Sequence, residues 1–411
     1  MASGSSLADV LRLPKLGHKK SMFGCQRCRK RRVKCNEAKP ICHNCERHQL
    51  PCVYDRAAGG LRSPQSSSSS SSFLQGTHSR QSQEREEQSY LAGALEGDDP
   101  PDGRTRRLLE VRLMHQYVTD TSISIAVDEV SRGIFVEAIP KHAFESDAML
   151  YGMYSMAALH LAIKGGEDSP VFREAARKYF SMAIREHNKE ISQLTKETVE
   201  LVCLTSNLMR NCAFIQLQGR DRHPYTPPWQ YLVVARTSTA TFTAAWKLGG
   251  ADPGSAIFRL LKFTYHIHHG MEGVSAEHKS TRLDYILERS ESHMAAESWD
   301  ADIQAAYEST LNYLGSVIDA SEGDQPPNDI QRRLTAFPML VERRYVELVH
   351  AGCPRALVIL AHYFAMLSRY EYRWWVGDTP VSEVRAIGDT LAADWQDLMK
   401  WPLETIEHSE H

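Results

Sequence analysis

The chain has 411 residues, 42% of them hydrophobic, so it is long enough for more than one domain and apolar enough for a large core. No run approaches 18 uninterrupted apolar residues, so we expect no membrane-spanning segment. The net charge of −3 is unevenly distributed: residues 1–55 contain 12 Lys and Arg against 4 Asp and Glu, whereas the remainder contains 36 against 47. This asymmetry predicts a polyanionic partner for the first segment only.

After residues 1–20, which we expect to be disordered, six of the nine cysteines occur at the spacing C-x2-C-x6-C-x6-C-x2-C-x6-C. A structural zinc site takes four tetrahedral ligands, so six thiolates either close one site and leave two over, or close two sites by sharing. Two ions need eight ligand positions, which six cysteines fill if two of them bridge. The doubled C-x2-C-x6-C repeat makes Cys25 and Cys42 the symmetric choice for bridges. The predicted ligands of two Zn²⁺ ions are Cys25, Cys28, Cys35, Cys42, Cys45 and Cys52.

A disulfide framework or an iron–sulfur site would also use several cysteines, but the sequence favours neither. A disulfide framework needs an oxidising compartment, and the first residues, MASGSSLADVLRLPKLG, lack the apolar core of a signal peptide. An iron–sulfur site could use four cysteines, but it accounts for neither the doubled repeat nor the basic residues inside it.

A basic run lies between the second and third cysteines. Short helices are predicted after Cys25 and Cys42, carrying residues 27–32 and 44–48. A charge run is usually a solvated face, but five cations on a metal-stabilised knob suit contact with phosphate and guanine. The predicted DNA-contacting residues are Arg29, Lys30, Arg31, Arg32 and Lys34.

The segment CQRCRKRRVKCNEAKPICHNCERHQLPC, with Pro40 two residues before the fourth cysteine, resembles the fungal Zn2Cys6 binuclear zinc-cluster transcription factors. This resemblance implies a nuclear, sequence-specific regulator of RNA polymerase II genes that binds double-stranded DNA at CGG-type triplets and acts with the transcription machinery. It also implies that Arg31 and Arg32 contact bases and phosphates. The two ligand sets would be Cys25, Cys28, Cys35, Cys42 and Cys25, Cys42, Cys45, Cys52.

Residues 57–103 are rich in Ser, Gln, Gly, Pro and acidic residues, with seven consecutive serines at 66–72. Such a segment buries too little apolar surface to offset its ordering entropy, so we predict a flexible linker. Its acidic end could be an activation segment, although a solvated tether is the preferred interpretation. No sustained heptad follows the cysteines, so the sequence gives no support for a homodimer held by a coiled coil.

From Arg104 onward the apolar residues have helical spacing. Leu109, Leu113 and Tyr117 form one stripe, with Val111, Met114 and Val118 beside them. Breakers at 165–166, 227–228, 249–250 and 326–327 separate the later stretches. Residues 354–367 are apolar almost all round, which predicts a central buried helix. The predicted helical stretches after this stripe are 148–163, 171–187, 198–217, 229–248, 303–318, 339–349, 354–370, which contains this buried helix, and 381–399.

Residues 108–402 resemble the regulatory domain of zinc-cluster regulators of the sterol-uptake-control type. The resemblance is carried by LLEVRLMHQYVTDT, MLYGMYSMAALHLA, ALVILAHYF and the closing Trp401 and Pro402. It implies an interior pocket for an apolar small-molecule effector and control of sterol or secondary-metabolite genes. A packed helical core without a ligand accounts for the same apolar pattern, so both interpretations stay open.

The remaining polar and reactive residues favour structural roles. The three histidines of YHIHHG, His266, His268 and His269, are interpreted as a helix-end patch, and His160 and His362 as hydrogen-bonded core residues. The cysteines outside the repeat, Cys203, Cys212 and Cys353, are predicted to be buried thiols. Trp374 and Trp375 are interpreted as packing residues rather than a ligand clamp. No phosphate loop, nucleophile elbow or metal-hydrolase motif is present, so we predict that the chain is not an enzyme.

The predicted architecture is mainly α. It comprises a disordered N-terminus (1–20), a zinc-cluster head (21–56), a flexible linker (57–103) and a large all-α regulatory domain (104–411). The competing hypothesis is a pathway co-regulator or scaffold in which the zinc cluster is only a folding unit.

Overall fold

The computed structural model describes residues 25–31, 33, 35–38, 41–47, 52, 103–248, 254, 258–259, 280–323 and 325–409. The chain splits into two compact units, one containing the six-cysteine segment and the other containing the helices from Arg104 onward. In the described part of the chain, every regular element is a helix, as the sequence predicts. The predicted disordered N-terminus and flexible linker lie outside the described residues, so the four domain boundaries stay predictions.

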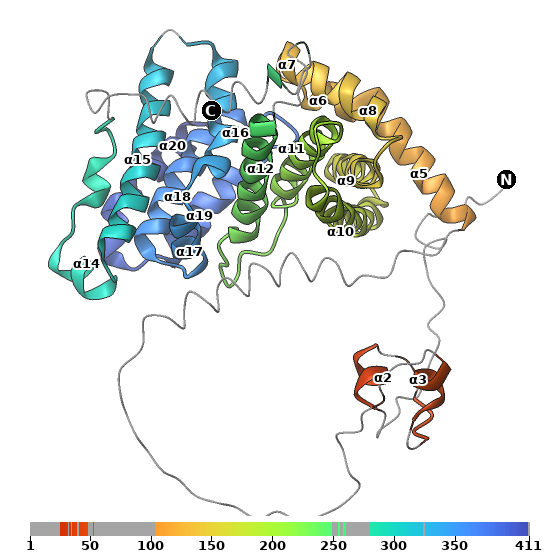
Figure 1. Ribbon diagram of the computed structural model, residues 1–411. Coiled ribbons are helices and arrows are strands. Elements are labelled where there is room, and N and C mark those ends of the chain that lie inside the picture. Colours follow the sequence, from red (N-terminus) through yellow and green to blue (C-terminus); the bar gives the residue numbers. More distant parts are fainter. Residues whose placement is uncertain are drawn as a thin grey trace, which may run out of the picture. The chain divides into compact units, whose positions relative to one another are not determined.

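The cysteine unit contains two short helices, α2 (Gln26–Lys30) and α3 (His43–Arg47) (Figure 1). Each helix begins directly after the first cysteine of one repeat, which agrees with the predicted positions. Both are single-turn helices with little core of their own, and the buried residues that surround them are cysteines. The cysteines are therefore the only apolar centre among the described residues of this unit.

The helical unit is formed by one bundle of helices (Figure 1). Helix α9 packs on α5, α10 and α11, helix α12 packs on α11 and α16, and α18 packs on α19 and α20. The first half of this unit comprises α5 (Arg104–Gln116), η1 (Tyr117–Thr121), α6 (Ser122–Ile125), α7 (Glu129–Arg132), η2 (Gly133–Ala138), α8 (Ile139–His142), α9 (Asp147–Lys164), α10 (Ser169–Ser192), α11 (Val199–Ile215) and α12 (Trp229–Leu248).

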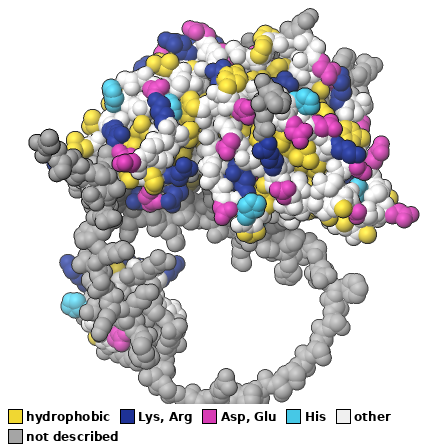
Figure 2. Space-filling view, turned by 180° about the vertical axis from the view of Figure 1, so that it is seen from behind, with side chains coloured by type: hydrophobic (Ala, Val, Ile, Leu, Met, Phe, Trp, Pro, Cys, Tyr) yellow, Lys and Arg dark blue, Asp and Glu magenta, His cyan; other side chains and the backbone are white. Residues whose placement is uncertain are grey.

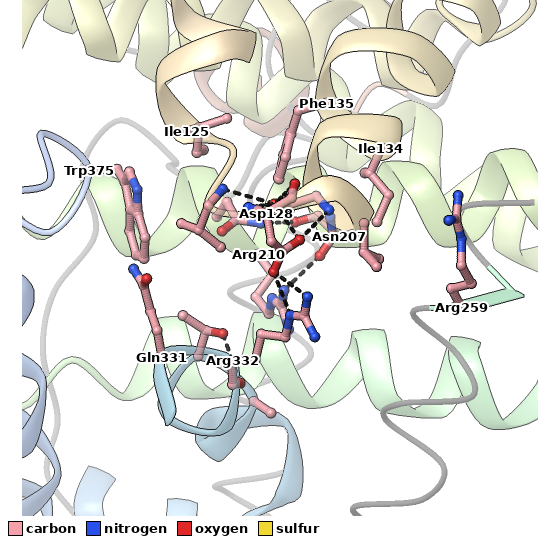
Figure 3. Close-up of a pocket in the computed structure, with 16 residues that line it drawn as sticks. Ile125, Asp128, Ile134, Phe135, Asn207, Arg210, Arg259, Gln331, Arg332 and Trp375 are labelled. Atoms are coloured by element: carbon pink, nitrogen blue, oxygen red, sulfur yellow. Dashed lines mark hydrogen bonds and ion pairs between the residues drawn. The ribbon is translucent and has the colours of Figure 1, made fainter. Parts of the chain in front are cut away.

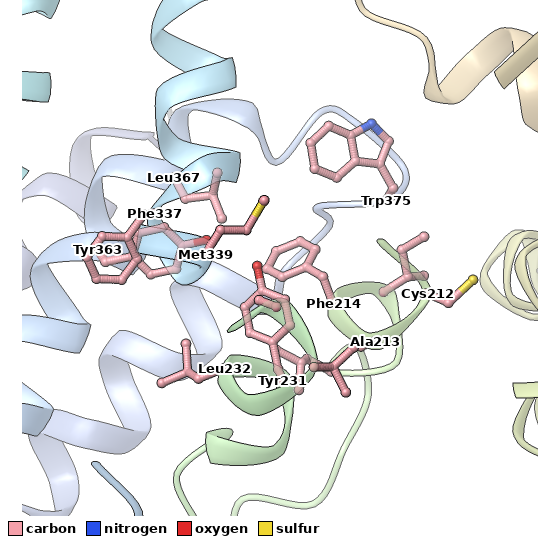
Figure 4. Packing of buried hydrophobic residues seen from close by; sticks show 14 of the residues in the cluster. Cys212, Ala213, Phe214, Tyr231, Leu232, Phe337, Met339, Tyr363, Leu367 and Trp375 are labelled. Atoms are coloured by element: carbon pink, nitrogen blue, oxygen red, sulfur yellow. The ribbon is translucent and has the colours of Figure 1, made fainter. Parts of the chain in front are cut away.

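The second half of the unit surrounds one fully buried helix. Every residue of α18 from Arg355 to Leu367 is buried, which confirms the predicted central helix, and Pro354 lies in its first turn. Phe337 stacks on Tyr363 with ring centroids 4.3 Å apart (Figure 4). This half comprises η4 (Asp284–Leu287), α14 (Glu291–Ala296), α15 (Ala301–Glu322), α16 (Pro327–Leu340), α17 (Arg343–His350), α18 (Pro354–Leu367), η5 (Ser368–Tyr370), α19 (Thr379–Thr390), η6 (Ala393–Trp395) and α20 (Gln396–Ser409).

Helix boundaries follow local capping chemistry. The Ser146 hydroxyl accepts from the backbone N–H of Met149 at the start of α9, and the Asp300 carboxylate does the same for Ile303 at the start of α15. Helix α9 ends at Gly165 and Gly166, whose φ angles of 83° and 104° suit glycine. This pair of glycines is the predicted breaker.

Two predicted helical stretches are each divided in the structure. The stretch 339–349 contains the end of α16 and all of α17, because Val341 and Glu342 adopt extended backbone angles. The carbonyl of Met339 in the last turn of α16 accepts from Thr239 of α12, and the carbonyl of Val341, just after α16, accepts from Arg236 of the same helix. The stretch 381–399 is likewise divided after Thr390. The end of α16 thus has tertiary partners, and the carbonyls of Gly388 and Leu391 near the end of α19 accept from the side chain of Gln396, so apolar spacing alone reveals neither end.

The predicted apolar stripe of α5 is confirmed for Leu109, Leu113 and Tyr117, which are buried. The residues beside the stripe are more exposed than predicted, because Val111 is 67% exposed and Val118 is 42% exposed. The buried face is therefore narrower than predicted.

The face shown in Figure 2 carries positive and negative side chains interspersed with one another, over the helices of the large unit. Such mixing agrees with the acidic balance of this part of the chain and gives no single-sign surface on that face. Among the described residues, no single helix is long and apolar enough to cross a membrane. The pair Arg343–His350 and Pro354–Tyr370 reaches that length and composition only when the two helices are joined, and they are bent by 106°.

Candidate zinc centre and nucleic-acid interface

The six cysteine sulfurs lie at distances that suit tetrahedral metal coordination. The Cys25 and Cys42 sulfurs are 3.7 Å apart, those of Cys25 and Cys45 are 3.7 Å apart, and those of Cys28 and Cys42 are 3.6 Å apart. Two sulfurs bound ~2.3 Å from one tetrahedral zinc ion are about 3.8 Å apart. A disulfide would require an S–S distance of about 2.05 Å. The spacing therefore fits shared metal ligation and excludes disulfides between these pairs.

The sulfurs form two groups of four, and within each group all atoms lie within 4.8 Å of one another. Cys25 and Cys42 belong to both groups, as the repeat symmetry predicts. The first group adds Cys28 and Cys35, and the second adds Cys45 and Cys52. Four sulfurs at these distances match the soft donor set and ligand number of structural zinc, so the residues fit two ions with two bridging thiolates.

The two halves of the centre repeat one local turn. The backbone N–H of Cys28 donates to the Cys25 sulfur over 3.4 Å, and the N–H of Cys45 donates to the Cys42 sulfur over the same distance. In addition, the N–H of Cys42 donates to the Cys52 sulfur at 3.3 Å. These donors offset the negative charge of thiolates, and they orient each sulfur through the first turn of α2 or α3.

Burial and crowding favour the thiol form of Cys25, Cys28 and Cys45 unless a cation is bound. Desolvation, assisted by the neighbouring sulfurs of Cys42 and Cys25, raises the pKa of Cys45 to about 12. Desolvation also raises the pKa of Cys25 and Cys28. A metal ion reverses this preference because a coordinating thiol loses its proton. Metal binding at this centre is therefore coupled to proton release.

The predicted DNA-contacting residues are described in part. Lys30 is exposed at the end of α2, and Arg31, also exposed, follows it with its N–H donating to the carbonyl of Arg27 at 2.9 Å. The backbone of Arg29 lies in α2. The side chain of Arg29, together with Arg32 and Lys34, lies outside the described residues. The structure thus places two of the five predicted cations on the surface.

One further cation joins this surface. Arg27 is exposed, and it precedes Lys30 and Arg31 by three and four positions. Residues at these separations share one side of a helix, so the three cations form a continuous basic face. Arg27 is absent from the predicted contacts because it lies before the second cysteine, outside the basic run. The i, i+3, i+4 spacing is the signal in the sequence that would include it.

The histidines predicted to be core residues have that role. His160 is buried, with its Nδ1 atom 2.9 Å from the Thr121 hydroxyl, and it stacks on Trp374. The Nδ1–H of His362 donates to the Val358 carbonyl at 2.8 Å, so its Nε2 accepts from the Tyr285 hydroxyl at 2.9 Å. The histidine patch at 266–269 lies outside the described residues.

The remaining cysteines and tryptophans mostly follow the prediction. Cys203 and Cys212 are fully buried, whereas Cys353 is only half-buried. Desolvation raises the pKa of both Cys203 and Cys212 to about 12, so these thiols are protonated at neutral pH. Trp375 packs on Phe214 in the core, as predicted for a packing residue, but it also lines a pocket of the helical unit.

Two regions of the chain match described protein families. Residues 23–60 match the fungal Zn(2)-Cys(6) binuclear cluster domain, and residues 112–218 match the fungal specific transcription factor domain. The chain therefore carries both domains that the fungal Zn2Cys6 transcription factors combine. Accordingly, this Zn2Cys6 protein is a DNA-binding transcription regulator whose cluster domain binds two zinc ions, and the predicted fold class, family and cofactor are confirmed.

Two relatives are similar to this chain over most of their length. A Zn(2)-C6 fungal-type transcription factor of Aspergillus fumigatus, afumD, is 28% identical over 355 residues, which cover 85% of this chain and 86% of the relative. A Zn(2)-C6 fungal-type transcription factor of Gibberella zeae is 25% identical over 439 residues, covering 95% of this chain and 86% of the relative. The similarity therefore extends through the helical domain.

Similarity to a sterol regulator is much shorter. Sterol uptake control protein 2 of Candida albicans is 54% identical over 37 residues, which are 9% of this chain and 5% of that protein. A match of this length cannot span the helical domain. The predicted resemblance of the helical domain to this type of regulator therefore gains no support from this match.

Proposed function

We propose that this Zn2Cys6 protein is a nuclear, sequence-specific regulator of RNA polymerase II genes that reads CGG-type triplets through its zinc-cluster head. The observation that carries the proposal is the sharing of Cys25 and Cys42 by two four-sulfur groups, because this arrangement fixes α2 on a rigid metal centre. The proposed ligands are Cys25, Cys28, Cys35 and Cys42 for one ion, and Cys25, Cys42, Cys45 and Cys52 for the other.

The bound zinc ions supply a structural scaffold, and the cations of α2 supply recognition. An arginine guanidinium can donate two hydrogen bonds to O6 and N7 of guanine, which distinguishes this base from the other three in the major groove. A contact from a lysine or arginine side chain to a phosphate oxygen positions the protein without base preference. We assign base contact to Arg31 and Arg32, and phosphate contact to Arg29, Lys30 and Lys34.

We further propose the domain limits given by composition: a head at 21–56, a linker at 57–103 and a helical regulatory domain at 104–411. The nucleus follows from the proposed DNA partner, and the transcription machinery is the protein partner. Because the family consists of transcription factors, we assign the chain no catalytic reaction. Sterol or secondary-metabolite genes are the proposed targets, and an apolar effector of the helical domain is the proposed signal.

The deciding experiment is selection of bound duplexes from random DNA with the full chain. Enrichment of a CGG triplet supports the proposal, and the number and spacing of triplets report whether the protein binds as a monomer or a homodimer. Failure to enrich any sequence, while the protein retains two zinc ions, would favour the co-regulator in which the cluster is only a folding unit.

A further inference from the structure

The helical domain contains a pocket of about 400 Å³, between α6, α7 and η2 on one side and α11 and α16 on the other (Figure 3). This volume falls in the range of small-molecule sites, about 300–1,000 Å³. Most of its wall is apolar. The apolar side chains include Ile125, Val130, Ile134, Phe135, Ala336 and Trp375.

A buried arginine lies in the wall of this pocket. Arg210 of α11 is 9% exposed, its Nη2 donates to the Asn207 side-chain oxygen at 2.6 Å, and its Nη1 faces the sulfur of Met339. Within the described residues, no carboxylate forms an ion pair with it. A buried charge without a counterion is costly, and desolvation accordingly lowers the pKa of Arg210. The site therefore favours an anion.

The other charged groups of the pocket strengthen this preference. Its lining includes three arginines, Arg210, Arg259 and Arg332, against one carboxylate, Asp128. Arg332 also pairs with Asp329 outside the lining, so these five groups together carry a formal charge of +1. Asp128 already pairs with Arg332 and accepts from the backbone N–H of Ser131. This carboxylate is therefore committed to its own side of the pocket and is not the counterion of Arg210.

Two further polar residues of the wall have atoms without partners. Gln331 is 1% exposed, and both its amide nitrogen and its amide oxygen are without hydrogen bonds. Trp375 is 5% exposed, and its indole N–H is also unpaired. Buried polar groups of folded proteins are nearly always paired, so three unpaired atoms in one pocket wall indicate groups that a ligand satisfies.

We propose that this pocket binds a small, largely apolar organic acid that carries at least one further oxygen. Its anionic group pairs with Arg210, its second oxygen accepts from Trp375 or bonds with the Gln331 amide, and its apolar body packs on Ile134 and Phe135. This inference names the chemical class of the effector proposed for the helical domain and rests on that proposal. A neutral sterol would leave Arg210 uncompensated.

The test is calorimetric titration of the full chain with 3-hydroxy-2-naphthoic acid and 12-hydroxydodecanoic acid, each paired with its neutral primary amide. At least one acid should bind, with an affinity at least 10-fold higher than that of its amide, because only the acid carries the counterion. Arg210→Met should abolish this preference. Arg112→Met, outside the pocket, should keep it, and Thr335→Phe, which fills the pocket, should remove binding of both compounds.

Gln331→Leu and Trp375→Phe test the second oxygen. Each should reduce the advantage of the hydroxylated acid over the same acid without the hydroxyl, and circular dichroism at 222 nm verifies that each variant is folded. The proposal is overturned if neither acid binds at 1 mM, if the amides bind as tightly as the acids, or if binding survives Thr335→Phe. DNA binding is measured separately, so its failure is distinguishable from failure of the ligand site.

Discussion

The sulfur atoms of Cys25 and Cys42 lie 3.7 Å apart, and both belong to each of the two four-sulfur groups. This pair is the edge that the two tetrahedra share. Loss of either sulfur therefore removes a ligand from both groups, whereas loss of Cys28, Cys35, Cys45 or Cys52 removes a ligand from one group only. The chain thus contains its own comparison between bridging and terminal ligands.

We predict that the full chain binds two zinc ions, that Cys25→Ser lowers the content of both, and that Cys28→Ser lowers mainly one. The reason is that a structural zinc site loses affinity when its fourth thiolate is missing. Elemental analysis of the purified proteins gives the stoichiometry, and cobalt substitution reports each thiolate site by absorption. Cys203→Ser is the matched control, because that buried cysteine belongs to neither group. One metal ion in the unmodified chain would contradict the shared cluster.

The second prediction separates base contact from phosphate contact on the head. Arg32→Ala or Arg31→Ala should weaken binding to the preferred site by about 1–3 kcal/mol and relax preference at one guanine. Lys34→Ala should weaken binding to matched and mismatched duplexes equally, and it should reduce the salt dependence of the binding constant. Titration at fixed salt against both duplexes measures the difference. If both arginine variants lose the same binding free energy on the two duplexes, Arg31 and Arg32 contact phosphates and not bases.

The cysteine centre could be predicted from sequence because its information is local. Spacing and repeat symmetry name Cys25 and Cys42 as the shared pair without any tertiary information, since tetrahedral geometry limits how six ligands serve two ions. The buried helix at 354–367 was predictable for a similar reason. A helix that is apolar on all sides can lie only in a core.

The pocket could not be predicted in the same way. Arg210 of α11 and Gln331 of α16 are far apart in the sequence, and their place in one pocket wall appears only after the helices pack. The end of α16 also depends on distant side chains, those of Arg236 and Thr239 in α12. In each case the deciding interaction is tertiary, so residue type and period contain no signal for it.

The third prediction concerns pH. Desolvation lowers the pKa of His362 to about 4, from a usual value of 6.5. The unfolded chain therefore takes up a proton at a higher pH than the folded chain, so this residue lowers the stability as pH falls from 6.5 to 4. The loss approaches about 3 kcal/mol for a shift of this size. His362→Gln should flatten the decline in urea-unfolding free energy over this interval.

His115→Gln provides the control for that measurement, because His115 lies exposed on α5. The unfolding free energy of His115→Gln should depend on pH in the same way as that of the unmodified chain. An unchanged slope in His362→Gln would show that the stability decline comes from other groups. His160, whose pKa desolvation also lowers to about 4, should account for part of the remaining slope.

The fourth prediction concerns the ion pair at the start of α18. Arg355 is fully buried, and its Nη2 lies 2.7 Å from a carboxylate oxygen of Glu297. The guanidinium also lies near the rings of Trp299 and Trp395. Glu297→Ala leaves this charge buried without its counterion, so the unfolding free energy should fall by about 3–5 kcal/mol. Urea unfolding followed by circular dichroism at 222 nm measures this free energy. Glu407→Ala, at an exposed position of α20, is the control and should change the unfolding free energy little.

The last prediction compares two buried arginines with opposite environments. Arg355 has the Glu297 carboxylate, whereas Arg210 lacks an ion-pair partner among the described residues. Arg355→Met should therefore destabilise the chain by about 3–5 kcal/mol, because it breaks a buried pair and leaves the buried Glu297 carboxylate with only Arg289, at 3.3 Å, as a counterion. Arg210→Met removes a desolvated charge and keeps an apolar side chain of similar length, so the unfolding free energy should stay constant or increase. A native arginine whose removal does not lower stability is retained for a reason other than folding, which is what a ligand site requires. If Arg210→Met instead lowers the unfolding free energy as much as Arg355→Met does, Arg210 is a structural ion-pair residue and the anion site is wrong.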